Sequence, residues 1–136
     1  MARKPKALVL DSWSVIAYLE DESAGQQIAQ LISSAHADDV PVMMTVVNVG
    51  EVWYILAREI SEEDANSSIK QLRDLRIQFI EADWDLTLAA ARIKAHHKMS
   101  YADCYAAALA KHKKADLVTG DKEFKSVEDQ IAVLWV

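Results

Sequence analysis

Short apolar runs alternate along this chain with longer segments of helical periodicity, and this alternation limits the possible folds more than any other feature. Apolar side chains at successive positions, rather than at every second one, are typical of strands buried on both faces of a sheet. The segments expected as strands are Lys6–Leu10, Val40–Met44, Ile77–Ile80, Asp116–Thr119 and Ile131–Val136. Because strands and helices alternate, we expect a three-layer α/β/α sandwich around a central, mostly parallel sheet of about five strands.

The segments between these strands carry the signals of helices. In Gly25–Ala37, apolar side chains recur at the i, i+3, i+4 and i+7 spacing of an amphipathic helix. Ser61 precedes a run of acids, an order typical of a capped helix start. The segment after Ser100 is rich in alanine, so that helix can lie close to its neighbours. Further helices are expected over Ser14–Leu19, from Thr45 to about Arg58, and after Asp83.

The length of 136 residues fits one domain, which we expect to span residues 1–136, with residues 1–6 as a basic tail. The single cysteine, Cys104, excludes an intramolecular disulfide and an all-cysteine zinc site. No apolar run approaches the roughly 18 residues that span a bilayer. We therefore expect a cytoplasmic protein.

Four acidic residues stand where ligands of an α/β sheet would bind. Such ligands lie beyond the carboxyl ends of the strands, and Asp11 and Asp121 each follow a predicted strand. Asp103 lies in the first turn of the alanine-rich helix, and Glu51 lies on a largely apolar helix face without a basic neighbour within one turn. Structural explanations stay open. Helix capping would explain Asp11 and Asp103, a turn after Gly120 would explain Asp121, and a solvated helix edge would explain Glu51.

If the fold brings these carboxylates together, their mutual repulsion requires protons or divalent cations among them. Carboxylate oxygens are hard ligands that suit Mg²⁺ or Mn²⁺. Two such ions about 4 Å apart activate a water and stabilise the leaving oxygen of a phosphodiester. The four acids together therefore indicate metal-dependent phosphoryl chemistry that needs no protein nucleophile.

Each of the four acids lies in a short motif, and the order and spacing of the motifs extend over essentially the whole chain. The motifs are Leu8-Val9-Leu10-Asp11-Ser12, Asn48-Val49-Gly50-Glu51-Val52, Ser100-Tyr101-Ala102-Asp103 and Val118-Thr119-Gly120-Asp121-Lys122-Glu123-Phe124. Together they resemble the motifs of PIN-domain ribonucleases, and in particular those of the VapC-type toxins of bacterial and archaeal toxin–antitoxin pairs.

This resemblance implies an α/β sandwich that cleaves RNA with Mg²⁺ or Mn²⁺ held by Asp11, Glu51, Asp103 and Asp121. It also implies supporting hydrogen bonds from Ser12 and Thr119, a homodimer, and a cognate antitoxin whose tail enters the active-site groove. The chain departs from the family pattern at Trp13, where many relatives have a small or polar residue. That departure concerns the shape of the groove rather than the metal ligands. The basic stretch Arg3–Lys6 is a small extension that could contact phosphate.

Other sites on α/β folds fit these residues less well. A phosphatase of the haloacid dehalogenase type needs a second aspartate two residues after the nucleophile, where this chain has Trp13. A receiver domain has an acidic pair near the first strand end, and no such pair accompanies Asp11. Cys104 could be a thiol nucleophile, but packing of a small helical residue explains it as well. The four histidines show no spacing that assigns them to a metal, and packing explains most of the four tryptophans.

The net charge of −6 gives no overall attraction to nucleic acid. Basic residues are concentrated, however, between Arg92 and Lys114, where six bases and one acid give +5 and leave −11 elsewhere. Lysines near helix C-termini complement the helix dipole, so the concentration has a structural explanation. As a functional strip, these residues would guide the RNA backbone towards the acids. The six are Arg92, Lys94, Lys98, Lys111, Lys113 and Lys114.

We therefore expect a Mg²⁺- or Mn²⁺-dependent endoribonuclease that acts as the toxin of a type II toxin–antitoxin pair. A metal-activated water would attack the phosphorus. The alternative is a catalytically silent PIN-like module that binds RNA or a protein partner without cutting.

Overall fold

The computed structural model describes residues 4–20 and 22–136. Within these residues, five strands form one sheet, and six α-helices and the 3-10 helix η1 surround it. In chain order the elements are β1 (Leu8–Leu10), α1 (Ser12–Leu19), α2 (Gly25–Ala37), β2 (Val42–Thr45), α3 (Val46–Glu59), α4 (Glu62–Asp74), β3 (Gln78–Ile80), α5 (Trp84–His96), α6 (Tyr101–Lys113), β4 (Asp116–Thr119), η1 (Lys122–Val127) and β5 (Ala132–Trp135).

The strands follow the order β3-β2-β1-β4-β5, and every neighbouring pair is parallel. The predicted α/β sandwich is confirmed, with a sheet that is wholly rather than mostly parallel. From β1 the chain moves outward to β2 and β3, and it then returns to the other side of β1 with β4 and β5. The direction of winding therefore reverses between β1 and β4. At such a reversal a crevice opens beyond the carboxyl ends of the strands.

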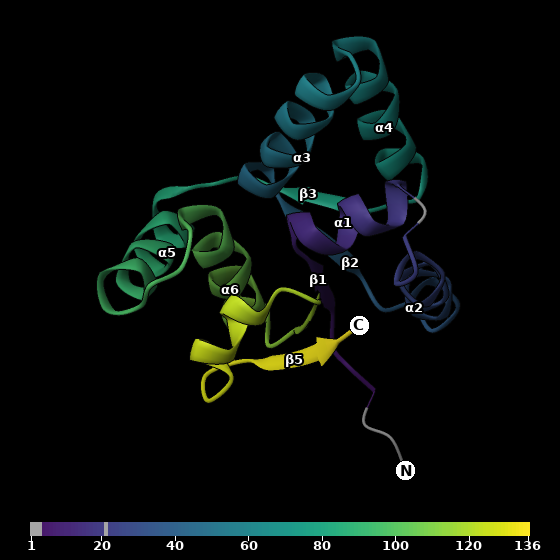
Figure 1. Ribbon diagram of the computed structural model, residues 1–136. Coiled ribbons are helices and arrows are strands. Elements are labelled where there is room, and N and C mark those ends of the chain that lie inside the picture. Colours follow the sequence, from purple (N-terminus) through teal and green to yellow (C-terminus); the bar gives the residue numbers. More distant parts are fainter. Residues whose placement is uncertain (1–3, 21) are drawn as a thin grey trace.

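Side-chain alternation along the strands divides the interior into two cores. Leu8 and Leu10 face a core shared with α1 to α4, whereas Val9 faces a core shared with α5, α6 and η1. Figure 1 shows α5 and α6 gathered on one side of the sheet, apart from α1 to α4. Because helices cover both faces, successive strand positions are all apolar, which is the pattern that predicts the strands.

Helix α6 lies deep in the molecule. Every residue from Asp103 to Ala110 is buried, and several of them are alanine or cysteine. These small side chains let the helix backbone pack closely against β1, β2 and β4. Since α6 runs into the start of β4, its own first turn lies at the opposite, carboxyl end of the strands. That placement brings Asp103 towards the crevice.

The structure changes several predicted boundaries. Strand β1 begins at Leu8 rather than at Lys6, and α1 begins at Ser12 rather than at Ser14. A 3-10 helix forms over Lys122–Val127, where the sequence pattern predicts none. Of the expected basic tail, residues 1–3 lie outside the described residues, and residues 4–6 form neither helix nor strand. No helix in the described part of the chain is long and apolar enough to cross a membrane.

Candidate metal centre

Asp11 is completely buried at the carboxyl end of β1, and it also caps α1. Its Oδ1 accepts a hydrogen bond from the backbone N–H of Ser14 at 2.8 Å. Its Oδ2 accepts a hydrogen bond from the hydroxyl of Thr119. One carboxylate oxygen therefore does the capping that the sequence suggests, while the other faces β4.

Thr119 connects the ends of β1 and β4 through its hydroxyl group. The hydroxyl donates to Asp11 and accepts a hydrogen bond from the backbone N–H of Asp121 at 3.0 Å. Thr119 is itself fully buried, so water does not compete for these bonds. The turn that carries Asp121 is thus fixed relative to Asp11.

Three carboxylates gather beside this turn. Oxygen atoms of Asp103, Asp121 and Glu123 lie within 4.8 Å of one another. Asp103 comes from the first turn of α6, where Ser100 Oγ accepts a hydrogen bond from the Asp103 N–H at 3.2 Å. Asp121 caps η1 by accepting a hydrogen bond from the Glu123 N–H at 3.0 Å, so the start of η1 brings both acids to one place. Asp103 is buried and Glu123 is exposed, so the group opens to solvent on one side.

Burial and mutual repulsion raise the pKa of two of these carboxyl groups. Burial first, and then a hydrogen bond with Glu123, raises the pKa of Asp103 to about 8. The negative charges of Asp121 and Asp11 act in the same direction. Burial raises the pKa of Asp11 to about 6, against the lowering effect of its hydrogen bond from Thr119. These interactions make one electrostatic unit, the acidic cluster, of Asp11, Asp103, Asp121 and Glu123.

The donor set of the acidic cluster fits a divalent cation such as Mg²⁺ or Mn²⁺. All four side chains offer carboxylate oxygen, which these hard cations prefer. Among the described residues, the ion pair found within 4.0 Å joins Lys70 and Asp74, so no described lysine or arginine forms an ion pair with the cluster. A bound cation would favour the charged carboxylates that burial and repulsion disfavour.

Asn48 holds the first turn of α3 against the cluster. Its side-chain amide donates to Ser12 Oγ at 3.3 Å and to the backbone carbonyl of Ala102 at 3.1 Å. Ser12 Oγ in turn donates to the backbone carbonyl of Asn48 at 3.2 Å. Among the described residues, Ser12 thus bonds to α3 rather than to a carboxylate. Its support of the metal ligands stays a prediction. A polar side chain in the first turn of an apolar helix is the sequence signal that could have identified Asn48.

Glu51 lies on α3, three residues after Asn48 and therefore on the same face of the helix. Its side chain is half-buried. Among the described residues, the carboxylates that meet within 4.8 Å are those of Asp103, Asp121 and Glu123, and Glu51 is outside this set. As a metal ligand, Glu51 stays a prediction.

Glu123 is a member of the acidic cluster that the sequence did not predict. It lies in the motif around Asp121, but it approaches the other acids only because a 3-10 helix follows Asp121.

Trp13 packs against the turn that follows β4. A Cβ atom placed on Gly120 would lie only 2.3 Å from the indole ring of Trp13. The indole thus occupies the space that a side chain at Gly120 would fill. The large residue at Trp13, which departs from the motif pattern, is accommodated by the small one at Gly120.

The six basic residues expected to form an RNA-binding strip have different surroundings. Arg92 and Lys111 line one cavity between α5 and α6. Lys94 donates to a backbone carbonyl at 2.6 Å, so its charge is engaged within the α5–α6 connection. Their contact with RNA stays a prediction. All six, including Lys98, Lys113 and Lys114, are exposed.

Solved structures with a similar fold include VapC toxins and VapBC complexes. VapC20 of Mycobacterium tuberculosis, a Sarcin-Ricin loop cleaving toxin, has 19% identity and a TM-score of 0.70, covering 89% of this chain and 95% of its own. VapBC2 from Rickettsia felis, bound to a promoter DNA fragment, has 16% identity and a TM-score of 0.74, covering 96% and 98%. VapBC-1 from nontypeable Haemophilus influenzae has 16% identity and a TM-score of 0.71, covering 95% and 97%.

At these identities the structural likeness establishes the fold. No curated protein matches the chain in sequence. Residues 8–130 match the PIN domain, a span that includes every acid of the cluster. The chain therefore belongs to the PIN-domain family.

Proposed function

We propose that this chain is a Mg²⁺- or Mn²⁺-dependent endoribonuclease that hydrolyses phosphodiester bonds in RNA. The observation that carries this proposal is the acidic cluster, in which the oxygens of Asp103, Asp121 and Glu123 lie within 4.8 Å of one another. Asp11 joins them electrostatically from the end of β1. Carboxylates that repel each other need protons or a cation among them, and an all-carboxylate donor set suits a divalent cation, so the cluster favours catalysis over a silent binding module.

In this proposal the acidic cluster supplies the cation ligands, and Glu51 approaches as a further ligand from α3. Bound Mg²⁺ or Mn²⁺ would supply the Lewis acidity that activates water and stabilises the leaving oxygen of a phosphodiester. The chain itself provides orientation. Thr119 fixes the Asp11 carboxylate, and Asn48 ties the first turns of α1, α3 and α6 together.

We also propose a biological role. The chain is a single PIN-like domain that acts in the cytoplasm as a homodimer, and it is the toxin of a type II toxin–antitoxin pair. The support for this role is the nearly full-length likeness to VapBC complexes, among them those from Rickettsia felis and Salmonella typhimurium. A cognate antitoxin is the expected protein partner. A short reading frame for such a protein immediately upstream of this gene would support the assignment.

The substitution Asp103→Asn tests the ribonuclease proposal. It replaces a carboxylate that would bind the cation by a neutral amide of the same size, so we expect RNA cleavage in Mg²⁺ or Mn²⁺ to fall on the order of 100-fold or more. The matched control is Asp64→Asn. Asp64 occupies the same position after a capping serine in α4, where its N–H donates to Ser61 Oγ at 3.1 Å. The readout is cleavage of a labelled RNA, with and without a chelator.

Asp64→Asn is expected to cleave at the wild-type rate. If Asp103→Asn also cleaves at the wild-type rate in Mg²⁺, the assignment of the site is wrong. If the wild-type protein neither binds Mn²⁺ nor cleaves RNA in any divalent metal, the silent binding module becomes the better interpretation.

A further inference from the structure

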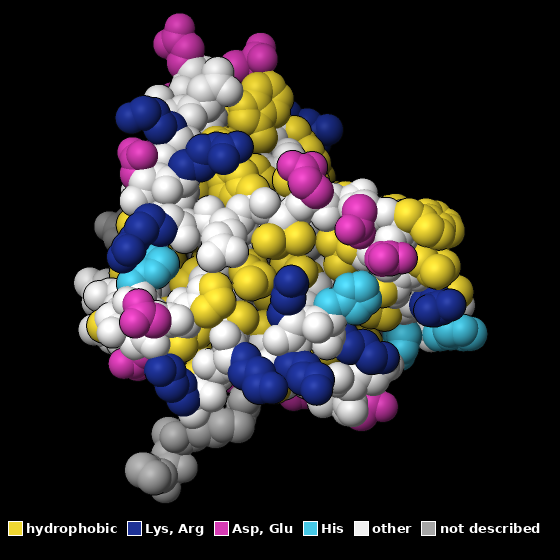
Figure 2. Space-filling view, turned by 180° about the vertical axis from the view of Figure 1, so that it is seen from behind, with side chains coloured by type: hydrophobic (Ala, Val, Ile, Leu, Met, Phe, Trp, Pro, Cys, Tyr) yellow, Lys and Arg dark blue, Asp and Glu magenta, His cyan; other side chains and the backbone are white. Residues whose placement is uncertain are grey.

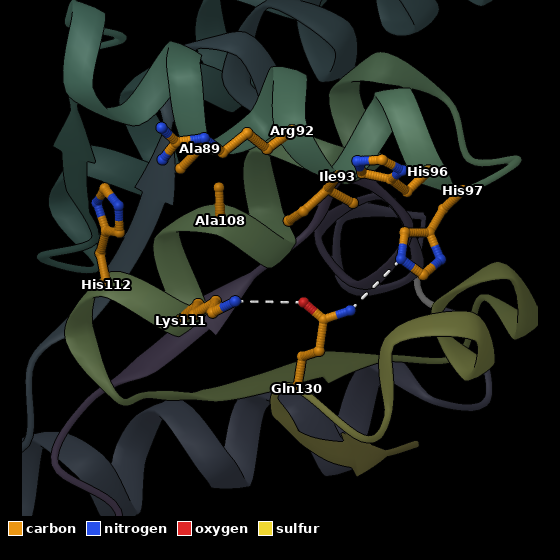
Figure 3. Close-up of a pocket in the computed structure, with 9 residues that line it drawn as sticks. All are labelled: Ala89, Arg92, Ile93, His96, His97, Ala108, Lys111, His112 and Gln130. Atoms are coloured by element: carbon orange, nitrogen blue, oxygen red, sulfur yellow. Dashed lines mark hydrogen bonds between the residues drawn. The ribbon is translucent and has the colours of Figure 1, made fainter.

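A cavity of about 440 Å³ lies between α5 and α6, and none of the four clustered acids lines it. Its volume is within the range of about 300–1,000 Å³ that is usual for ligand sites. Ala89, Ile93 and Ala108 form an apolar floor. Around this floor stand nitrogen-bearing side chains that point towards the cavity from both helices and from the segment after η1 (Figure 3). They are Arg92, His96, His97, Lys111, His112 and Gln130.

The lining is cationic and contains no acid. Arg92 and Lys111 carry permanent charges, and neither forms an ion pair with a carboxylate anywhere in the described ranges. Gln130 accepts a hydrogen bond from Lys111 Nζ at 3.3 Å, and its amide nitrogen lies 3.4 Å from the His97 ring. Figure 3 shows Lys111, Gln130 and His97 in one connected row. The cavity therefore presents several donors to a ligand and few acceptors.

Structural roles account for only part of this lining. Lys111 and His112 lie in the last turn of α6 and His96 in the last turn of α5, where cations complement the helix dipole. Arg92 lies before the last turn of α5, so the dipole does not explain it. A metal site does not explain the three histidines either, because no group of ligand atoms within 4.8 Å includes any of them among the described residues.

From this cavity we propose a second RNA contact: a subsite that binds backbone phosphate of the strand whose scissile phosphate lies at the acidic cluster. The inference rests on the proposed function. Arg and Lys side chains bind phosphate by charge, and Arg can do so through paired N–H donors. The neighbouring imidazole and amide groups supply further donors. The apolar floor suits the sugar face of a nucleotide.

The location supports an RNA strand as the occupant. Lys111 follows Asp103 by eight residues on the same helix, which is about 12 Å along the axis of α6. A strand held at the cluster could therefore reach the cavity within a few nucleotides. Figure 2 shows Lys, Arg and His side chains gathered at the lower right, on the side of the molecule that carries α5. Since the acidic cluster repels a polyanion, attraction must come from such a separate basic surface.

Two substitutions at the cavity, Arg92→Gln and Lys111→Gln, test the subsite. Each removes one charge and keeps most of the side chain. The probe is a fluorescently labelled single-stranded RNA, and its affinity is measured by anisotropy in chelator, so that no cleavage occurs. At about 0.1 M salt we expect each substitution to weaken binding about tenfold and to reduce the log–log salt slope by about one.

Lys70→Gln is the matched control, because Lys70 is a helical lysine on α4 that is 79% exposed. We expect it to change RNA affinity less than about twofold. Lys111→Arg keeps the charge and should keep the affinity, and equal thermal midpoints of all variants exclude unfolding as the cause. If Arg92→Gln and Lys111→Gln bind RNA as Lys70→Gln does, the subsite is wrong even where wild-type protein cleaves RNA. If wild-type protein neither binds nor cleaves RNA, the proposed function fails instead.

Discussion

Single residues at the centre of this molecule serve the fold and the site at once. Asp11 caps α1 with one carboxylate oxygen and receives the Thr119 hydroxyl with the other. Asp121 likewise caps η1 and belongs to the acidic cluster. A capping interpretation and a catalytic interpretation of such acids are therefore compatible. From sequence alone, capping and a place in an acidic site look like alternatives, whereas Asp11 and Asp121 each cap a helix and also belong to the acidic cluster.

Thr119→Val tests the hydroxyl that links Asp11 to the turn of Asp121. Valine keeps the shape but leaves both polar partners without this bond, so we expect the free energy of unfolding to fall by about 1–3 kcal/mol. We also expect Mn²⁺ binding to weaken by roughly 10–100-fold, since the carboxylate of Asp11, a proposed metal ligand, loses its support. Urea unfolding and calorimetric titration with Mn²⁺ measure the two effects.

Thr87→Val is the control for this substitution. The hydroxyl of Thr87 lies 2.7 Å from that of Tyr105, at a half-buried position outside the acidic cluster. It should cost stability and leave Mn²⁺ binding unchanged. Equal loss of Mn²⁺ affinity in both variants would contradict the supporting role of Thr119.

At the scale of elements, the turn between β4 and η1 decides how the acids meet. This turn brings Asp121 and Glu123 towards Asp103 on α6, and the indole of Trp13 packs against its Gly120. The strand-end rule predicts Asp11 and Asp121 near one another. The sequence pattern does not predict η1, because a 3-10 helix of six residues is too short to show a repeating pattern of apolar side chains.

Gly120→Ala tests the contact between this turn and α1. Its Cβ would lie 2.3 Å from the Trp13 ring, so the turn or the indole must move. We expect a loss of about 1–3 kcal/mol in the free energy of unfolding. Trp13→Ala should relieve the clash, and the double substitution should then cost less than the sum of the two single ones, with a coupling of about 0.5–3 kcal/mol. Denaturant unfolding of the four proteins measures this cycle.

Gly50→Ala provides the comparison. No atom lies within 4 Å of a Cβ at Gly50, which is exposed on α3. Alanine there should stabilise the helix by up to about 1 kcal/mol. If the free-energy changes of Trp13→Ala and Gly120→Ala simply add in the double variant, the two positions are not in steric conflict.

At the scale of the whole molecule, the net charge of −6 is unevenly distributed. Part of the negative charge is concentrated in the acidic cluster, whereas the cavity between α5 and α6 is lined by cations. The overall charge is therefore a poor guide to affinity for RNA. The positions of the charges matter more than their sum, because salt screens charges that lie beyond about 10 Å.

The raised pKa values predict how stability depends on pH without metal. Asp103 and Asp11 have folded-state pKa values of about 8 and about 6, above the ordinary value of 3.8. The folded state thus binds more protons than the unfolded state. Protonation of these two carboxyl groups stabilises the fold, and this stabilisation is lost as pH rises through their folded-state pKa values. In chelator, we expect the thermal midpoint to rise as pH falls from about 8 to about 5.

Added Mn²⁺ should reverse this trend, because the cation binds the charged carboxylates and stabilises the protein most at the higher pH. Asp103→Asn in chelator should flatten the pH dependence, since its side chain does not titrate. Thermal unfolding followed by circular dichroism measures all three conditions. A thermal midpoint in chelator that rises with pH over this range would contradict the assigned protonation.

The sequence by itself determined the layers and the region of the site. Continuous apolar runs predict the buried parallel strands, helical periodicity predicts their cover, and the strand-end acids point to one edge of the sheet. These features are local, and the chain displays them in order. Tertiary structure alone decided which side chains meet. It brought in Glu123 through an unpredicted 3-10 turn, tied Asn48 to two other helices, left Glu51 outside the closest group of carboxylates, and placed Arg92 and Lys111 around one cavity. These contacts depend on packing between residues far apart in sequence, so the local hydrophobic periodicity of the chain does not predict them.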